Sequence, residues 1–176
     1  MPTTPASPAA ARCCFARWAT KAAGGALLLT LAACGGPDRR SAAASQAALR
    51  IDPCSLVTRA EAEALLGGPV AGPDKSAAHG QFVQCRYLAR GGPEAGRLTV
   101  QVHAVDLRSK QRAFRDSGET ARPVRGIGDE AFWAPAMGAL YVGKGPVTAS
   151  FAAAAPGLDS RTASRSLAVR ALARIP

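Results

Sequence analysis

Apolar and polar residues alternate along residues 82–88 and again along residues 97–105. A period of two is typical of a β-strand that buries one face and leaves the other face in water. The turn-forming sequence Gly-Gly-Pro-Glu at 91–94 lies between the two stretches. The pattern therefore predicts two antiparallel strands connected by a short turn.

Shorter apolar stretches predict further strands. Three of them lie in the second half of the chain, at 130–134, 139–142 and 147–153, and one lies in the first half, at 70–77. The glycine- and proline-containing sequence at 143–146 separates the last two strands, and such a sequence is typical of a turn.

The first helix is expected at about 58–66. Thr58 precedes Glu61 by three residues, which is the spacing of a capping box, and apolar residues follow at helical spacing. Gly67 then supplies a left-handed residue that ends the helix. We expect the carboxylate of Glu61 to be a charge on the helix surface.

Two more segments have helical patterns. The polar stretch at 106–116 predicts a surface helix, and a broad apolar stripe predicts a final helix from Asp159 or Ser160 to about Arg174. Helices and strands in this order predict a single α+β domain, a mostly antiparallel sheet with helices packed on one face.

The first 33 residues differ in composition from the rest. They carry three basic residues, Arg12, Arg17 and Lys21, no acidic residue, and an apolar run at 22–33. This run is too short to span a bilayer, and the arrangement is typical of a secretory signal peptide. The sequence therefore predicts an exported protein.

The sequence Leu-Ala-Ala-Cys at 31–34 resembles the lipobox of bacterial lipoproteins. The resemblance implies that the chain is cut before Cys34 and that the Cys34 thiol carries a diacylglyceride. The alternative is an ordinary signal peptide followed by an incidental cysteine. We expect a signal peptide at 1–33, a flexible tether at 34–50 and a folded domain at 51–176.

A lipid on Cys34 implies a membrane anchor. Gly35 occupies the position where the diderm sorting pathway reads an aspartate as a retention signal. The resemblance to sorted lipoproteins therefore implies the periplasmic face of the outer membrane in a diderm cell. In a monoderm cell it implies the outer face of the cell membrane.

The net charge of the mature chain is positive. Residues 34–176 carry 19 basic and 12 acidic residues, a net charge of +7. Such a surface attracts anionic lipid headgroups or other envelope polyanions, although the composition of a GC-rich genome explains the same charge. Nucleic acid is not an expected partner, because an exported lipoprotein seldom meets it.

Two cysteines remain after the signal peptide and the lipidated residue are set aside. Cys54 and Cys85 are expected to pair in an oxidising compartment, where two thiols in one small domain usually form a disulfide. The alternatives are two buried free thiols or an incomplete metal site. No Cys-x-x-Cys spacing among these residues favours a metal.

Four sequence features together resemble a family of small bacterial lipoproteins of unknown function that is abundant in high-GC, actinobacterial-type genomes. They are Asp-Pro-Cys-Ser-Leu-Val-Thr at 52–58, Cys-Arg-Tyr at 85–87, Gly-Ile-Gly-Asp-Glu-Ala-Phe-Trp at 126–133 and Leu-Tyr-Val at 140–142. The resemblance spans about residues 51–173. It implies an exported α+β domain with a disulfide between the two cysteines, and it carries no activity.

Residues with catalytic chemistry are few. The histidines His79 and His103 are expected in a loop and on the wet face of a strand, without the partners that a base or a metal needs. We expect Ser55 to cap a helix and Asp129 to close its turn on its own backbone. No catalytic residue, metal ligand or cofactor is therefore expected, and the protein is not expected to be an enzyme.

Aromatic residues gather in the second half of the chain. Most of these rings are expected in the core, but strand alternation directs Phe132 and Trp133 to opposite faces. An outward ring, Trp133 or Tyr141, is the candidate for a partner or ligand face. The leading hypothesis is a lipid-anchored binding module for an unidentified envelope protein or polymer. The alternatives are a carrier or sensor of a small apolar ligand and, third, an envelope hydrolase.

Overall fold

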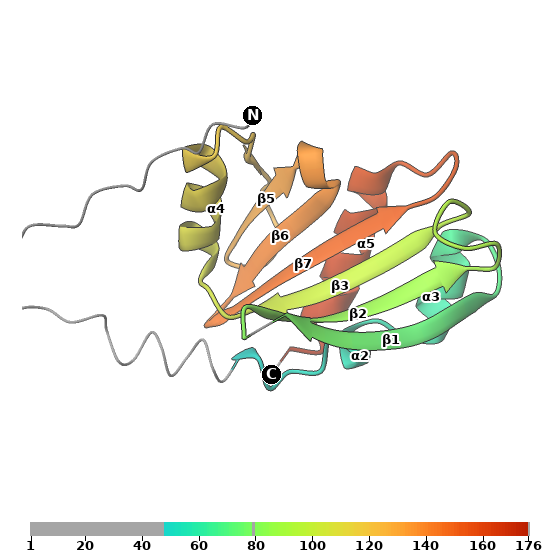
Figure 1. Cartoon of the computed structure of the whole chain (residues 1–176). Coiled ribbons are helices and arrows are strands. Elements are labelled where there is room, and N and C mark those ends of the chain that lie inside the picture. Colours follow the sequence, from blue (N-terminus) through green and yellow to red (C-terminus); the bar gives the residue numbers. More distant parts are fainter. Residues whose placement is uncertain (1–47, 79, 176) are drawn as a thin grey trace, which may run out of the picture. The chain divides into compact units, whose positions relative to one another are not determined.

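The structure is a computed structural model, and it describes residues 48–78 and 80–175 (Figure 1). The expected signal peptide, Cys34, most of the tether and His79 lie outside the described residues. The elements are, in chain order, α2 (Pro53–Leu56), α3 (Arg59–Leu66), β1 (Val70–Ala78), β2 (Phe82–Ala89), β3 (Arg97–His103), α4 (Leu107–Asp116), β4 (Arg122–Pro123), β5 (Glu130–Ala134), the 3-10 helix η1 (Pro135–Met137), β6 (Ala139–Lys144), β7 (Val147–Ala154) and α5 (Ser160–Leu172). None of the described helices is long and apolar enough to cross a membrane.

The seven strands form one antiparallel sheet in the order β1-β2-β3-β7-β6-β5-β4 (Figure 1). The first three strands are neighbours in the chain. The chain then passes through α4 to the far edge and returns strand by strand, until β7 pairs with β3. This architecture confirms the expected single α+β domain with an antiparallel sheet.

The helix α3 begins and ends as its sequence predicts. The Thr58 hydroxyl accepts the Glu61 backbone N–H at 3.2 Å, the Thr58 backbone N–H donates to Glu61 Oε2 at 2.8 Å, and Gly67 ends the helix at φ +77°. The short helix α2, which the pattern does not predict, begins at Pro53. Asp52 is its N-cap, and the Asp52 carboxylate accepts the Cys54 N–H at 3.0 Å. Ser55, expected as a cap, instead donates its hydroxyl to the Asp52 carbonyl at 2.7 Å.

The main core lies between the first face of the sheet and the helices α2, α3 and α5. In Figure 1, α5 crosses behind β7 and β3. The core residues of this face come from α2 and the residue after it, from β3, β6 and β7, and from one stripe of α5. They include Leu56, Val57, Leu98, Val100, Val102, Val142, Phe151, Leu167 and Ala171. Ala48 is also buried there, three residues before the expected start of the domain.

A second, smaller core lies on the opposite face of the sheet, under α4. Leu107 and Phe114 of α4 pack on Phe132 of β5 and Tyr141 of β6. The rings of Phe132 and Tyr141 stack with centroids 4.9 Å apart. Three helices therefore lie on the expected face, and α4 covers part of the second face over β5 and β6.

Candidate functional site

The second face of the sheet is largely free of helices over β1, β2 and β3 in the described part of the chain (Figure 1). The polar positions of the two alternating stretches lie on this face. We call it the open polar face, and its side chains are exposed or half-buried: Asp74, Ser76, Gln84, Arg86, Thr99 and Gln101.

A continuous row of hydrogen bonds crosses the open polar face. Gln84 Nε2 donates to Ser76 Oγ at 2.8 Å, and Gln101 Nε2 donates to Gln84 Oε1 at 3.0 Å. The Ser150 hydroxyl donates to Gln101 Oε1 at 3.2 Å. These four residues stand directly opposite one another in the register of β1, β2, β3 and β7. We call them the glutamine row.

His103 continues this row into the interior. Its Nε2 lies 2.9 Å from Ser150 Oγ, and because Ser150 gives its hydrogen to Gln101, the imidazole is the donor. The ring is 3% exposed and lies between Phe82 and Tyr141, at centroid distances of 5.8 and 5.6 Å. The expected position on a wet face is therefore wrong, because these two rings cover the imidazole.

Burial determines the protonation state of His103. Desolvation, and secondarily the charge of Lys110, lower the pKa of His103 from 6.5 to about 3. The imidazole is therefore neutral at neutral pH. Within residues 48–78 and 80–175, the side-chain hydrogen bond of this ring is the one to Ser150 Oγ.

A pocket of about 380 Å³ lies where β2 begins, β3 ends and α4 passes over the sheet. We call it the β3–α4 pocket. Its lining combines apolar side chains with a few polar ones: Gly80, Gln81, Phe82, His103, Ala104, Val105, Ser109, Lys110 and Ala113. Lys110 is half-buried, and burial lowers the pKa of its ammonium.

Trp133 and Tyr141 do not form an exposed aromatic face. Trp133 is 8% exposed in the main core, and Tyr141 is 4% exposed in the second core. Alternation does direct Phe132 and Trp133 to opposite faces. Neither ring is exposed, because Trp133 packs in the main core on the first face and α4 covers Tyr141 on the second face.

The Gly-Ile-Gly-Asp turn at 126–129 has a structural contact with the β6–β7 hairpin. Asp129 Oδ2 accepts the Gly145 N–H at 2.6 Å, and the Asp129 N–H donates to the Gly143 carbonyl at 2.8 Å. The side chain therefore binds a neighbouring turn, and not its own backbone as expected. At Gly128, φ is +57° and an added Cβ would clash with the Gly143 carbonyl oxygen.

The expected disulfide between Cys54 and Cys85 is confirmed. It joins α2 to β2, with the two Cα atoms 5.0 Å apart. Tyr87, two residues further along β2, donates its buried hydroxyl to the Val57 carbonyl at 3.0 Å. The two links hold the segment before α3 on the first face of the sheet.

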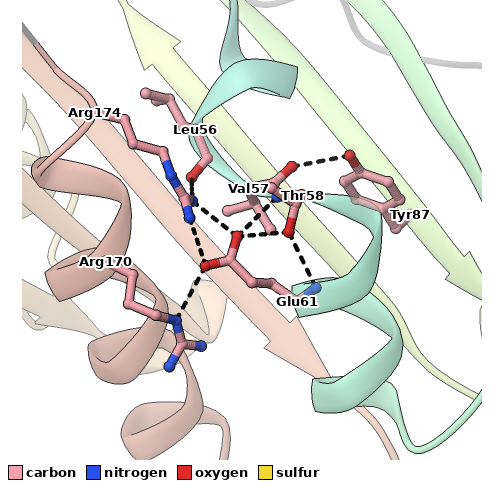
Figure 2. A network of polar contacts seen from close by, with 7 residues as sticks. All are labelled: Leu56, Val57, Thr58, Glu61, Tyr87, Arg170 and Arg174. Atoms are coloured by element: carbon pink, nitrogen blue, oxygen red, sulfur yellow. Dashed lines mark hydrogen bonds and ion pairs between the residues drawn. The ribbon is translucent and has the colours of Figure 1, made fainter.

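Glu61 is the centre of a polar network between α3 and α5 (Figure 2). Arg174 donates from Nη1 and Nη2 to its two carboxylate oxygens at 2.8 Å each, and Arg170 Nε lies 3.3 Å from Oε1. The Arg174 hydrogen bonds are the main cause that lowers the pKa of Glu61 from 4.5 to about 2. Glu61 is thus a largely buried ion-pair partner, and not the surface charge expected from its helix position.

Comparisons with family models, curated proteins and solved structures find no match for this chain. Within residues 48–78 and 80–175, no group of three or more His, Cys, Asp or Glu side chains could hold a metal ion. The open polar face and the β3–α4 pocket both present polar groups that a partner or ligand can bind. Sequence alternation identifies Gln84 and Gln101 as outward residues, but it contains no signal for their pairing or for Lys110.

Proposed function

We propose that this protein is an exported lipoprotein that is anchored to a cell-envelope membrane through Cys34 and binds an envelope protein or polymer through its open polar face. The acid-free first 33 residues and the Leu-Ala-Ala-Cys sequence at 31–34 support the anchor. The disulfide between Cys54 and Cys85 suits an oxidising compartment. No catalytic residue is assigned in this proposal.

The observation that carries the binding function is the glutamine row. Each carboxamide has two N–H donors and an oxygen with two lone pairs. The row uses one donor and one acceptor of Gln84 and of Gln101, so half of their capacity remains for a partner. Because the row holds both side chains in place, a partner pays little additional conformational entropy when it binds.

The chemistry of this face favours a polar partner. Hydroxyl and amide groups dominate it, and its one ion pair, Arg86 Nη2 to Asp74 Oδ2 at 2.7 Å, joins opposite charges. A partner rich in hydroxyl or amide groups, such as a glycan or an extended peptide, complements such a surface. Free phosphates or other strong anions have no concentrated positive charge to bind on this face.

Site-specific photo-crosslinking in cells tests this function. A photoreactive residue is placed at Ser76 or Thr99 on the open polar face, and at Val169 as a control, because Val169 is 54% exposed on α5 behind the sheet. We expect one discrete adduct from the two face positions that is absent at Val169. Identical adducts at all three positions, or adducts at Val169 alone, would contradict the proposal.

A matched pair of variants tests the polar chemistry itself. Gln84→Leu and Gln101→Leu keep the approximate volume of each side chain and remove its hydrogen-bonding groups. We expect both to decrease the yield of the Thr99 adduct, whereas Glu63→Gln on α3 leaves it unchanged. An unchanged yield in both leucine variants would mean that the glutamine row does not bind the partner.

A further inference from the structure

We propose that the β3–α4 pocket binds a small amphipathic carboxylate, whose apolar body lies against Phe82, Val105 and Ala113 and whose carboxylate pairs with Lys110. This site is separate from the open polar face, and the inference does not depend on the function proposed for that face. The proposed ligand differs from the small apolar ligand of the carrier or sensor alternative, because it carries a negative charge.

The geometry of the pocket separates an apolar part from a charged part. Phe82, Ala104, Val105 and Ala113 provide apolar surface, and Lys110 and Ser109 provide polar groups from α4. Val105 is 44% exposed, which is unusual for a large apolar residue in this domain. A volume of about 380 Å³ lies near the lower end of the range of ligand pockets, so a small ligand fits best.

The charge of Lys110 selects an anion. Within residues 48–78 and 80–175, no ion pair and no side-chain hydrogen bond involves its ammonium. The Asp106 carboxylate, one helical turn away, accepts the Ser109 N–H at 2.9 Å and caps α4. A half-buried ammonium without an acidic partner is stabilised by an anionic ligand, since the attraction offsets its desolvation.

The other charged and aromatic groups at the pocket are compatible with this ligand. His103 adds no positive charge, because its ring is buried and neutral. The Lys110 ammonium lies 5.8 Å from the centroid of the Tyr141 ring, which holds the cation over an aromatic face. Among the described residues that line the pocket, Lys110 supplies the positive charge and stands beside apolar walls. This combination fits one carboxylate attached to an apolar body.

Calorimetric titration with three matched compounds tests the site. The full chain in detergent micelles is titrated with 4-phenylbutyrate, 4-phenylbutanol and 4-phenylbutylamine, and the heats of protein-free micelles are subtracted. We expect the acid to bind about ten-fold more tightly than the alcohol and the amine. Equal affinities for the three compounds, or no binding of the acid at millimolar concentration, would overturn the proposal.

Three variants locate the binding. Lys110→Gln is expected to lower the affinity for the acid to that of the alcohol, and Arg112→Gln, an exposed neighbour on α4, is expected to leave it unchanged. Ala113→Trp fills the pocket and is expected to abolish binding of the acid. The thermal midpoint of this variant, expected to equal that of the wild type, is the folding control. Equal losses in Lys110→Gln and Arg112→Gln would show a general charge effect and contradict the site.

The two proposals can fail separately. Crosslinking from Ser76 on the open polar face should persist in Ala113→Trp, because that residue lies on α4 and outside the face. If Ala113→Trp loses carboxylate binding while crosslinking from the face stays intact, the function proposed for the open polar face is unaffected. If the protein binds the carboxylate but gives no specific crosslink, the function proposed for the open polar face is wrong and the ligand site in the β3–α4 pocket is supported.

Discussion

Gln101 Nε2 donates a hydrogen bond to Gln84 Oε1 across the β2–β3 pair, at 3.0 Å. This contact is the middle of a chain of donors that all point the same way, from His103 through Ser150, Gln101 and Gln84 to Ser76. The chain of hydrogen bonds thus connects a buried histidine with polar groups at the exposed edge of the sheet. Each member of such a chain polarises the next, which strengthens the row.

Burial of His103 as a neutral ring should make the protein sensitive to mild acid. Its pKa is about 3 in the folded state and 6.5 in the unfolded chain, so below pH 6.5 the unfolded state binds more protons. Stability is complete above about pH 6.5 and decreases as the pH falls. Between pH 7 and pH 5 we expect a loss of about 2 kcal/mol from this residue.

Denaturant unfolding of wild type and His103→Gln at the two pH values measures this loss. The glutamine variant keeps a donor for Ser150 but does not titrate, so its stability should change by about 2 kcal/mol less between pH 7 and pH 5. His79 is present in both proteins and cancels in the comparison. Equal pH dependence in both proteins would show that His103 is not held neutral.

The ion pair between Glu61 and Arg174 should control stability in stronger acid. Its folded pKa of about 2 lies below the ordinary value of 4.5, so its contribution is present above pH 4.5 and is lost as the pH falls to about 2. Glu61→Gln retains a capping residue for Thr58 and removes the charge. We expect a loss of about 1.5–3 kcal/mol at pH 7.

Chemical denaturation from pH 7 to pH 2 checks this expectation. The difference between wild type and Glu61→Gln should shrink through this window and disappear near pH 2. Glu63→Gln on the same helix is the matched control, because no ion pair within the described residues involves Glu63. A constant difference at all pH values would mean that packing, and not the charge, explains the loss.

The disulfide should contribute strongly to folding stability. It closes a loop with a sequence separation of 31 residues, for which the chain-entropy relation gives about 3–4 kcal/mol. The double variant Cys54→Ala with Cys85→Ala should lose about that much in denaturant unfolding. Free thiols at both cysteines in protein purified from cells, detected by mass spectrometry of non-reduced peptides, would contradict the bridge in the native protein.

The turn before β5 should tolerate no side chain at Gly128. Its left-handed φ of +57° and the close approach of the Gly143 oxygen both oppose an added Cβ, so Gly128→Ala should cost about 1–3 kcal/mol. Gly68→Ala is the control, since an added Cβ there meets nothing within 4 Å. Equal thermal midpoints for the two variants would contradict this role.

Local patterns in the sequence predict most of the elements. The capping box at Thr58, the alternation at 82–88 and 97–105, and the turn at 143–146 each correspond to an element of the structure within a few residues. These signals depend only on residues that are close in the chain, so they can be recognised without knowledge of the tertiary structure. The two-residue strand β4 and the short helix α2 carry too few residues for any period to appear.

The binding features depend on contacts that the sequence pattern does not contain. Alternation places Gln84 and Gln101 on the outward face, but only the register brings them opposite each other. The polar pattern of α4 correctly indicates a surface helix, yet it does not say which strands lie beneath. That position of α4 buries Tyr141 and creates the β3–α4 pocket beside Lys110.

The mass of the amino-terminal peptide tests the central claim, that this domain is exported and anchored by Cys34, most directly. Protein from the membrane fraction is digested and analysed by mass spectrometry, with Cys34→Ser as the matched control. We expect a mature chain that begins at Cys34 with a diacylglyceryl group, since stable anchoring requires two acyl chains, and a Cys34→Ser protein in the soluble fraction. An unmodified Cys34, or a Cys34→Ser protein that stays in the membrane with the same processed mass, would contradict the anchor.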